Sequence, residues 1–333
     1  LLLEAARNQL DYTVLKAPFD GVVTSVLMKE NEMSGSGNPV VIFASVINKN
    51  FLTYSNLSTL MLQSSIKGII ALGMTLVIIS GQIDLSVGSL VALVAGLGVV
   101  VLNTTQSMLL MLVFCIIFGG VLGTVNGILV TKGKIAPFIV TLATMSAFRS
   151  IIVQLGQGGP FNVSSEMYNS FRLVAAGSVG VIPNLAIIYF IITLFMAFIM
   201  EKTKFGRYIY AVGSNEKAAK LTGINTDFIK ASVFIITGML TGVSAFLLSS
   251  RLTSITAPNA GVAFELDAIA AVAIGGTAMS GGRGKIFGTF LGAIMLQMIE
   301  GILIAANIPP FLTGLVKGVI IILAVLFQSK KNR

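Results

Sequence analysis

The sequence contains no histidine and a single cysteine among its 333 residues. Without histidine, catalysis by a Ser-His-Asp triad is excluded, and a Cys/His metal site is excluded as well. Cys115 lies inside an apolar run, so it has no intrachain disulfide partner, and a packing role is expected for it. We therefore expect no bound metal, no other cofactor and no catalytic residues.

Charge is also scarce. Charged residues make up 11% of the chain and hydrophobic residues 55%, and the mean hydropathy is +0.93. A soluble protein of this composition has too few polar groups to cover its surface. The long apolar runs predict an all-α polytopic protein of the lipid bilayer, with about eight or nine spans or half-spans. The net charge of +9 does not indicate nucleic-acid binding, because much of the lysine and arginine lies in short loops, where it sets orientation.

Residues 1–45 differ in composition from the rest of the chain. Short strands are predicted at 12–15, 21–28 and 40–43, with turns between them at Pro18 and 34–39. The chain starts without a charged and then apolar signal region, which is the pattern of a fragment or a fusion. The expected fold is thus a short β-rich N-terminal segment followed by membrane helices.

From residue 51 onward, long apolar runs alternate with short polar segments. The predicted spans and half-spans are residues 57–80, 90–102, 108–130, 137–155, 182–200, 231–248, 263–279, 286–306 and 311–327. The basic residues at 132–134, 201–230, 283–285 and in the tail then fall on one face, which the positive-inside rule places in the cytoplasm. Glycines four residues apart, in 119–127, 238–242 and 288–292, predict close helix contacts.

A short polar segment, residues 211–224, stands between two long apolar runs. Ser214 or Asn215 can N-cap a helix there, Glu216 suits its first turn, and Gly223 can end it. A helix of about two turns is not stable alone in water, so it must dock on something. One interpretation is a solvated basic loop that keeps this side of the protein in the cytoplasm. The other is a contact to a cytoplasmic partner that drives the protein.

Three carboxylates, Asp84, Glu265 and Asp267, are flanked by apolar residues. In hydrocarbon they are costly unless they are paired or hydrated. They either line a polar pathway and brace its gates, or each caps a helix end at the membrane surface, as Asp84 can for the second span. Asn126 and Gln297 are polar residues in the middle of spans, where they either hydrogen-bond between helices or face a solute.

The glycine-rich stretch 275–286 is not a phosphate-binding loop. Met279 stands where a Walker motif has its first glycine, and Ile286 stands where it has serine or threonine. The glycines instead predict a sharp intracellular turn or a helix break. The chain therefore has no ATP site of this type.

Three long motifs indicate a family. They are Gly81-Gln-Ile-Asp-Leu-Ser-Val-Gly-Ser89, the segment from Arg207 to Ile224, and Phe264-Glu-Leu-Asp-Ala-Ile-Ala-Ala-Val-Ala-Ile-Gly-Gly-Thr277 followed by the segment from Gly281 to Thr289. In this order they resemble the permease subunits of bacterial ABC importers for ribose and related simple sugars. The resemblance covers about residues 48–333.

The resemblance implies a multi-pass permease of the inner membrane that is not itself an enzyme. Such permeases form homodimers, bind an ATPase subunit in the cytoplasm and receive a monosaccharide from a periplasmic sugar-binding protein. By the same resemblance, the polar segment is the coupling helix that contacts the ATPase. Its residues are Ser214, Asn215, Glu216, Lys217, Ala218, Ala219, Lys220, Leu221, Thr222 and Gly223.

Residues 10–23 resemble the lipoyl-like β-hammerhead of periplasmic membrane-fusion adaptors, which divides the chain into an adaptor-like piece (1–45) and a permease domain (46–333). Other functions stay open. One is a permease for another small solute, such as branched-chain amino acids. Another is an efflux-adaptor fragment fused to a membrane anchor. A third is a secondary transporter, although no coupling-ion site can be identified.

Overall fold

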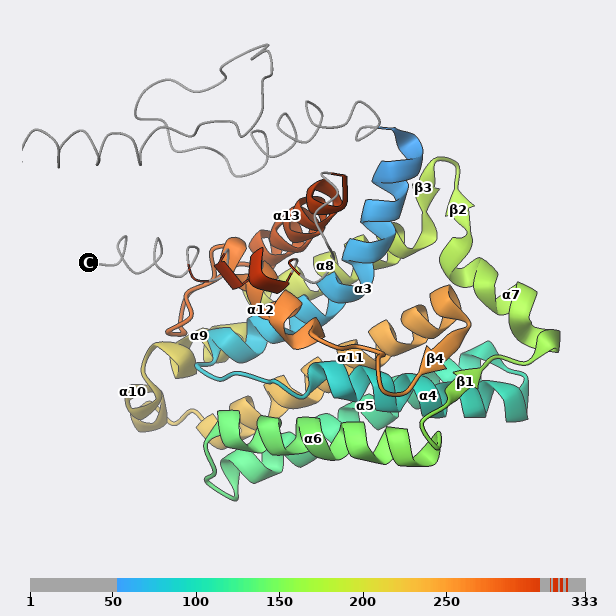
Figure 1. The fold of residues 1–333 in the computed structure, drawn as a ribbon. Helices are drawn as coiled ribbons and strands as arrows, with labels where there is room; N and C mark the ends of the chain where they lie inside the picture. The colour runs from blue at the N-terminus through green and yellow to red at the C-terminus, as the bar shows by residue number, and fades with distance from the viewer. Residues whose placement is uncertain (1–52, 306–311, 313, 317, 320–321, 323–333) are drawn as a thin grey trace, which may run out of the picture.

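The computed structural model describes residues 53–305 together with 312, 314–316, 318–319 and 322 (Figure 1). The predicted β-rich segment 1–45 lies outside these residues, as does most of the predicted last span. The helices are α3 (Tyr54–Ile79), α4 (Val87–Thr105), α5 (Met108–Thr131), α6 (Pro137–Leu155), α7 (Ser165–Ala176), α8 (Asn184–Lys202), α9 (Lys204–Ser214), α10 (Glu216–Leu221), α11 (Thr226–Leu252), α12 (Phe264–Ile274) and α13 (Ile286–Ala305).

Seven of these helices, α3, α4, α5, α6, α8, α11 and α13, are long and apolar enough to cross a membrane. The prediction of a mainly helical, multi-pass membrane protein is thus confirmed for the described residues. The boundaries follow local signals. Pro137 occupies the start of α6, where its missing N–H costs nothing, and the Asn225 side chain accepts from the Phe228 N–H at the start of α11. The run 263–279 forms only the eleven-residue helix α12, which is a half-span.

The two ends of the helix bundle differ. At one end Figure 1 places α9, α10 and the connection from α5 to α6, which carry the predicted cytoplasmic charges. The Tyr210 hydroxyl of α9 donates to the Gly284 carbonyl at 2.8 Å, which joins the basic turn 281–285 to this end. At the other end lie α7 and two short antiparallel pairs, β1 (Pro160–Asn162) with β4 (Ser254–Thr256) and β2 (Ser178–Val179) with β3 (Ile182–Pro183).

Helices α5 and α11 pack backbone against backbone. A Cβ atom added to Gly238 would lie 2.2 Å from the Gly119 carbonyl oxygen, and one added to Gly242 would lie 2.1 Å from the Cys115 carbonyl oxygen. The predicted glycine faces are therefore confirmed, because no larger residue fits at these positions without moving a helix. Cys115 is fully buried beside this contact, as expected for a packing role.

Two irregular segments enter the bundle and end at the same place. Residues 80–86 lead from α3 into α4, and residues 257–263 lead from β4 into α12. A Cβ atom added to Gly88, in the first turn of α4, would lie 2.3 Å from both the Gly261 carbonyl oxygen and the Glu265 carboxylate. Irregular backbone at membrane depth is tolerated only where protein buries it or where it lines a wet cavity. The meeting point of α4 and α12 is therefore one place in the described fold that can carry polar chemistry.

Candidate functional site

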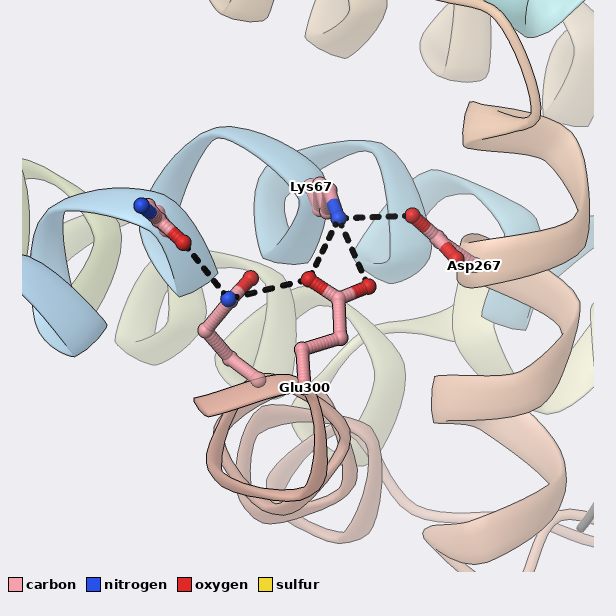
Figure 2. A network of polar contacts seen from close by, with 5 residues as sticks. Lys67, Asp267 and Glu300 are labelled. Carbon is pink, nitrogen blue, oxygen red and sulfur yellow. Dashed lines mark hydrogen bonds and ion pairs between the residues drawn. The ribbon is translucent and has the colours of Figure 1, made fainter. Parts of the chain in front are cut away.

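An ion cluster joins three helices inside the bundle (Figure 2). The Lys67 ammonium, near the middle of α3, lies 2.7 Å from an Asp267 carboxylate oxygen in α12 and 3.0 Å from Glu300 in α13. The Asp267 side chain is 2% exposed. Charges at this depth are stable only when they are paired or hydrated, and here one ammonium bridges two carboxylates.

Gln297 extends this cluster. Its Nε2 donates to Gln63 Oε1 at 2.6 Å and to Glu300 Oε2 at 3.0 Å. Of the two interpretations of Gln297, the hydrogen bond between helices is the one observed, since Gln63 belongs to α3. The sequence interpretation selected Asp267 and Gln297 but missed Lys67 and Glu300 as their partners. The available signal was that both residues interrupt apolar runs.

Asp84 and Asn126 form a second polar group. The Asp84 carboxylate accepts from the Ser86 N–H at 2.9 Å and from the Ser86 hydroxyl at 2.6 Å, and that hydroxyl accepts from Asn126 Nδ2 at 2.8 Å. Asn126 thus bonds to the segment before α4, as predicted for an inter-helix contact. The N-cap of α4 is Ser86 and not Asp84, which corrects the interpretation of Asp84 as that cap.

Glu265 lies apart from both groups. It occupies the first turn of α12 and lies against the first turn of α4, and Arg149 of α6 attracts it electrostatically. Arg149 Nη1 also donates to the Ala257 and Ala260 carbonyls, at 2.9 and 2.6 Å. Glu265 and Asp267 are both near a helix start, as one interpretation held. That start lies inside the bundle, however, because Asp267 reaches the middle of α3.

The polar segment, at the end of the bundle that was predicted to be cytoplasmic, forms two helices, where one was predicted. Ser214 ends α9, and Asn215 is the N-cap of α10, with its side chain accepting from the Ala218 N–H at 3.0 Å. This decides between the two predicted caps. Gly223 has φ +84°, and its N–H bonds to Lys220, which closes the helix as predicted. α9 was not predicted, although its buried Gly206, Ile209 and Val212 recur at helical spacing.

These two helices dock on the bundle through α9. A Cβ atom added to Gly213 would lie 1.6 Å from the Ile79 carbonyl oxygen, so the end of α9 touches the end of α3. The same carbonyl accepts from the Gly282 N–H at 2.8 Å, in the turn before α13. The positive φ angles of Gly281 and Gly282 confirm that this glycine-rich stretch forms a sharp turn. Three segments that are distant in the sequence therefore meet at one point.

Most of α10 faces outward. Ala219 is its one buried residue, and Glu216 pairs with Lys230 of α11 at 2.5 Å. The Leu221 side chain is 89% exposed, and that of Phe228, at the start of α11, is 62% exposed. Apolar side chains exposed among charged ones are typical of a protein contact surface.

The chain is similar to known transport proteins. Residues 56–325 match the family described as "Branched-chain amino acid transport system / permease component". The chain is 41% identical to the ribose import permease protein RbsC of Bacillus subtilis (strain 168), covering 88% of this chain and 90% of that protein. It is 33% identical to the L-arabinose ABC transporter permease protein AraH of Azospirillum brasilense, covering 88% and 86%. It is 32% identical to the xylose transport system permease protein XylH of Escherichia coli (strain K12), covering 85% and 87%. No solved structure matches it.

Proposed function

Since the chain belongs to this family of transport-system permease components, we propose that it is the transmembrane subunit of an ATP-driven importer that moves a monosaccharide into the cytoplasm. It is a multi-pass protein of the inner membrane. The observation that carries the choice of substrate is the similarity to permeases for ribose, arabinose and xylose along almost the whole chain. The family description names amino acids, and a branched-chain amino acid is therefore the alternative substrate.

The partners follow from the same premise. A separate cytoplasmic subunit hydrolyses ATP, a periplasmic binding protein delivers the sugar, and two permease subunits form a homodimer. In support, the glycine-rich stretch 275–286 departs from a Walker motif at Met279 and Ile286, so it offers no nucleotide site of that type. The permease itself is not an enzyme in this proposal.

The coupling helix is residues 214–223, and α10 is its helical part. Its exposed Leu221 supports this assignment, as does the contact of neighbouring Gly213 with Ile79. A displacement of α10 would move α9, which contacts the end of α3. The end of α3 is in turn hydrogen-bonded to Gly282, in the turn before α13. Closure of the ATPase subunits would in this way shift the membrane helices between two arrangements.

The buried polar residues form the pathway and its gates in this proposal. The group at Asp84 and Asn126 fixes the segment before α4, and the cluster at Asp267 and Gln297 fixes α12 and α13 against α3. Ionic and hydrogen-bonded contacts of this kind have discrete alternatives, which suits a gate with two states. Glu265 faces the remaining polar space, at the meeting point of α4 and α12.

The coupling assignment predicts the effect of Leu221→Asp. Because Leu221 is 89% exposed, the substitution leaves the fold intact but places a charge in the proposed ATPase contact. We expect capture of the chain by the ATPase subunit of a sugar importer, after co-expression, to fall at least about tenfold. The measurement is a pull-down on the ATPase from solubilised membranes.

The matched control is Leu173→Asp, because Leu173 is 65% exposed but belongs to α7 at the opposite end of the bundle. It should be captured like the wild type. Equal capture of the Leu221→Asp and wild-type chains would contradict the assignment of α10 as the coupling helix.

A further inference from the structure

A cavity of about 340 Å³ lies where α4, α6 and α12 come together, and its lining combines polar side chains with the apolar Met145, Val262 and Ala263. The polar side chains that line it are those of Ser89, Ser146, Arg149, Ser150 and Glu265. Its volume falls within the range of small-molecule sites, and such sites combine a few convergent polar groups with an apolar wall. The cavity adjoins the point where the segment 257–263 enters α12.

Two serine side chains lie at the exposed edge of the cavity, which we call its mouth. Ser146 and Ser150 lie one turn apart on α6, and both are exposed on the surface of the subunit. The next residue, Ile151, does not line the cavity, and its side chain is 46% exposed. Hydroxyl groups facing lipid are unfavourable, and they are stable where water or a polar solute meets them. This edge of α6 is therefore suited to a wet path.

The two charged groups in the cavity are complementary hydrogen-bonding partners for a solute. The Glu265 carboxylate accepts from its own backbone N–H, Arg149 attracts it electrostatically and Asp267 repels it. Among the described residues, no other side chain donates a hydrogen bond to it. Arg149 also lines the cavity, and its Nη1 donates to the Ala257 and Ala260 carbonyls. A guanidinium has further N–H donors beyond those on Nη1. A carboxylate only accepts hydrogen bonds and a guanidinium only donates them, and both bonds are charge-assisted.

We infer that this cavity is a contact site for the sugar in transit, which rests on the proposed function. Each sugar hydroxyl both donates and accepts, so neighbouring hydroxyls can donate to Glu265 and accept from Arg149, while Ser146 and Ser150 complete the contacts at the mouth. Five polar side chains without an aromatic stacking surface give a weak site. Weak binding suits passage, because a transported solute must also leave.

Cysteine labelling tests this site in the assembled importer. Cys115 is the only cysteine, so Cys115→Ala gives a background without thiols, to which Ser150→Cys or its neighbour Ile151→Cys is added. The full chain is reconstituted in proteoliposomes with the ATPase and the binding protein. A charged, membrane-impermeant methanethiosulfonate should label Ser150→Cys at least about tenfold faster than Ile151→Cys, because only a hydrated thiol ionises readily.

Ribose, arabinose and xylose are then added one at a time together with ATP. At least one of them should slow the labelling of Ser150→Cys several-fold, whereas leucine should not slow it. In a Ser150→Cys chain that also carries Glu265→Gln, labelling should stay fast and the protection should be lost. Glutamine keeps the size of the side chain but not its charge.

Two results would overturn the site. One is labelling of Ser150→Cys that is no faster than that of Ile151→Cys. The other is labelling that none of the three sugars slows, whether or not leucine slows it. If the same proteoliposomes import a monosaccharide, the proposed function stands although the site fails. A fully assembled importer that moves no monosaccharide overturns both.

Discussion

Replacing Lys67 by methionine is expected to destabilise the protein by about 3 kcal/mol, near the lower end for breaking a buried ion pair. The substitution removes the ammonium that lies 2.7 Å from Asp267 and 3.0 Å from Glu300, and it leaves the two carboxylates facing each other. The lower end applies because the Lys67 side chain is 21% exposed. Thermal unfolding in detergent, followed by far-UV circular dichroism, measures the loss as a lower Tm.

A variant that removes all three charges of the cluster tests whether the unpaired carboxylates cause this loss of stability. The triple variant Lys67→Met/Asp267→Asn/Glu300→Gln has no charge to compensate, so most of the lost stability should return. Lys132→Met removes an exposed lysine at the end of α5 and should leave the Tm unchanged. A single variant as stable as the wild type, or a triple variant as unstable as the single one, would show that the cluster does not hold the helices together.

The second large effect is expected at Gly213→Ala. The added methyl group would lie 1.6 Å from the Ile79 carbonyl oxygen, so α9 must separate from the end of α3. We expect the number of sugar molecules imported per ATP hydrolysed to fall at least about tenfold, which corresponds to the loss of about 1.4 kcal/mol of coupling. The two quantities are measured together in proteoliposomes that contain the assembled importer.

Gly180→Ala is the control for this variant. An added Cβ at Gly180 meets nothing within 4 Å, and the residue lies at the opposite end of the bundle. Gly180 has a positive φ, +62°, which Gly213 does not have, so any backbone strain falls on the control alone. It should import sugar with the wild-type yield per ATP. If Gly213→Ala behaves in the same way while its Tm is unchanged, motion does not pass from α9 to α3.

Local signals in the sequence predicted most of the elements. α6 was predicted at 137–155, its observed bounds, because a proline marks its start and a glycine follows its end. The close contact of α5 and α11 followed from glycines four residues apart, since that spacing places them on one face. In the polar segment 211–224, Asn215 was one of two predicted N-caps and Gly223 was the predicted end of the helix, because such residues are favoured at these positions.

Contacts between distant segments could not be predicted in this way. Nothing in the spacing of Lys67, Asp267 and Glu300 indicates that they meet, because the contact depends on how α3, α12 and α13 pack. For the same reason the sequence did not reveal that Arg149 and Glu265 share a cavity. Short elements with weak patterns were missed as well. The stretch between the predicted spans 137–155 and 182–200 contains the helix α7 (Ser165–Ala176), which was not predicted.

The measurement that tests the central claim most directly is ATP-driven uptake of radiolabelled ribose, arabinose and xylose by proteoliposomes. They contain this chain, a sugar-importer ATPase and its binding protein. We predict uptake of at least one of the three sugars that stops without ATP and stops without the binding protein, while leucine is not taken up. Uptake of leucine but of none of these sugars by the assembled complex would contradict the account.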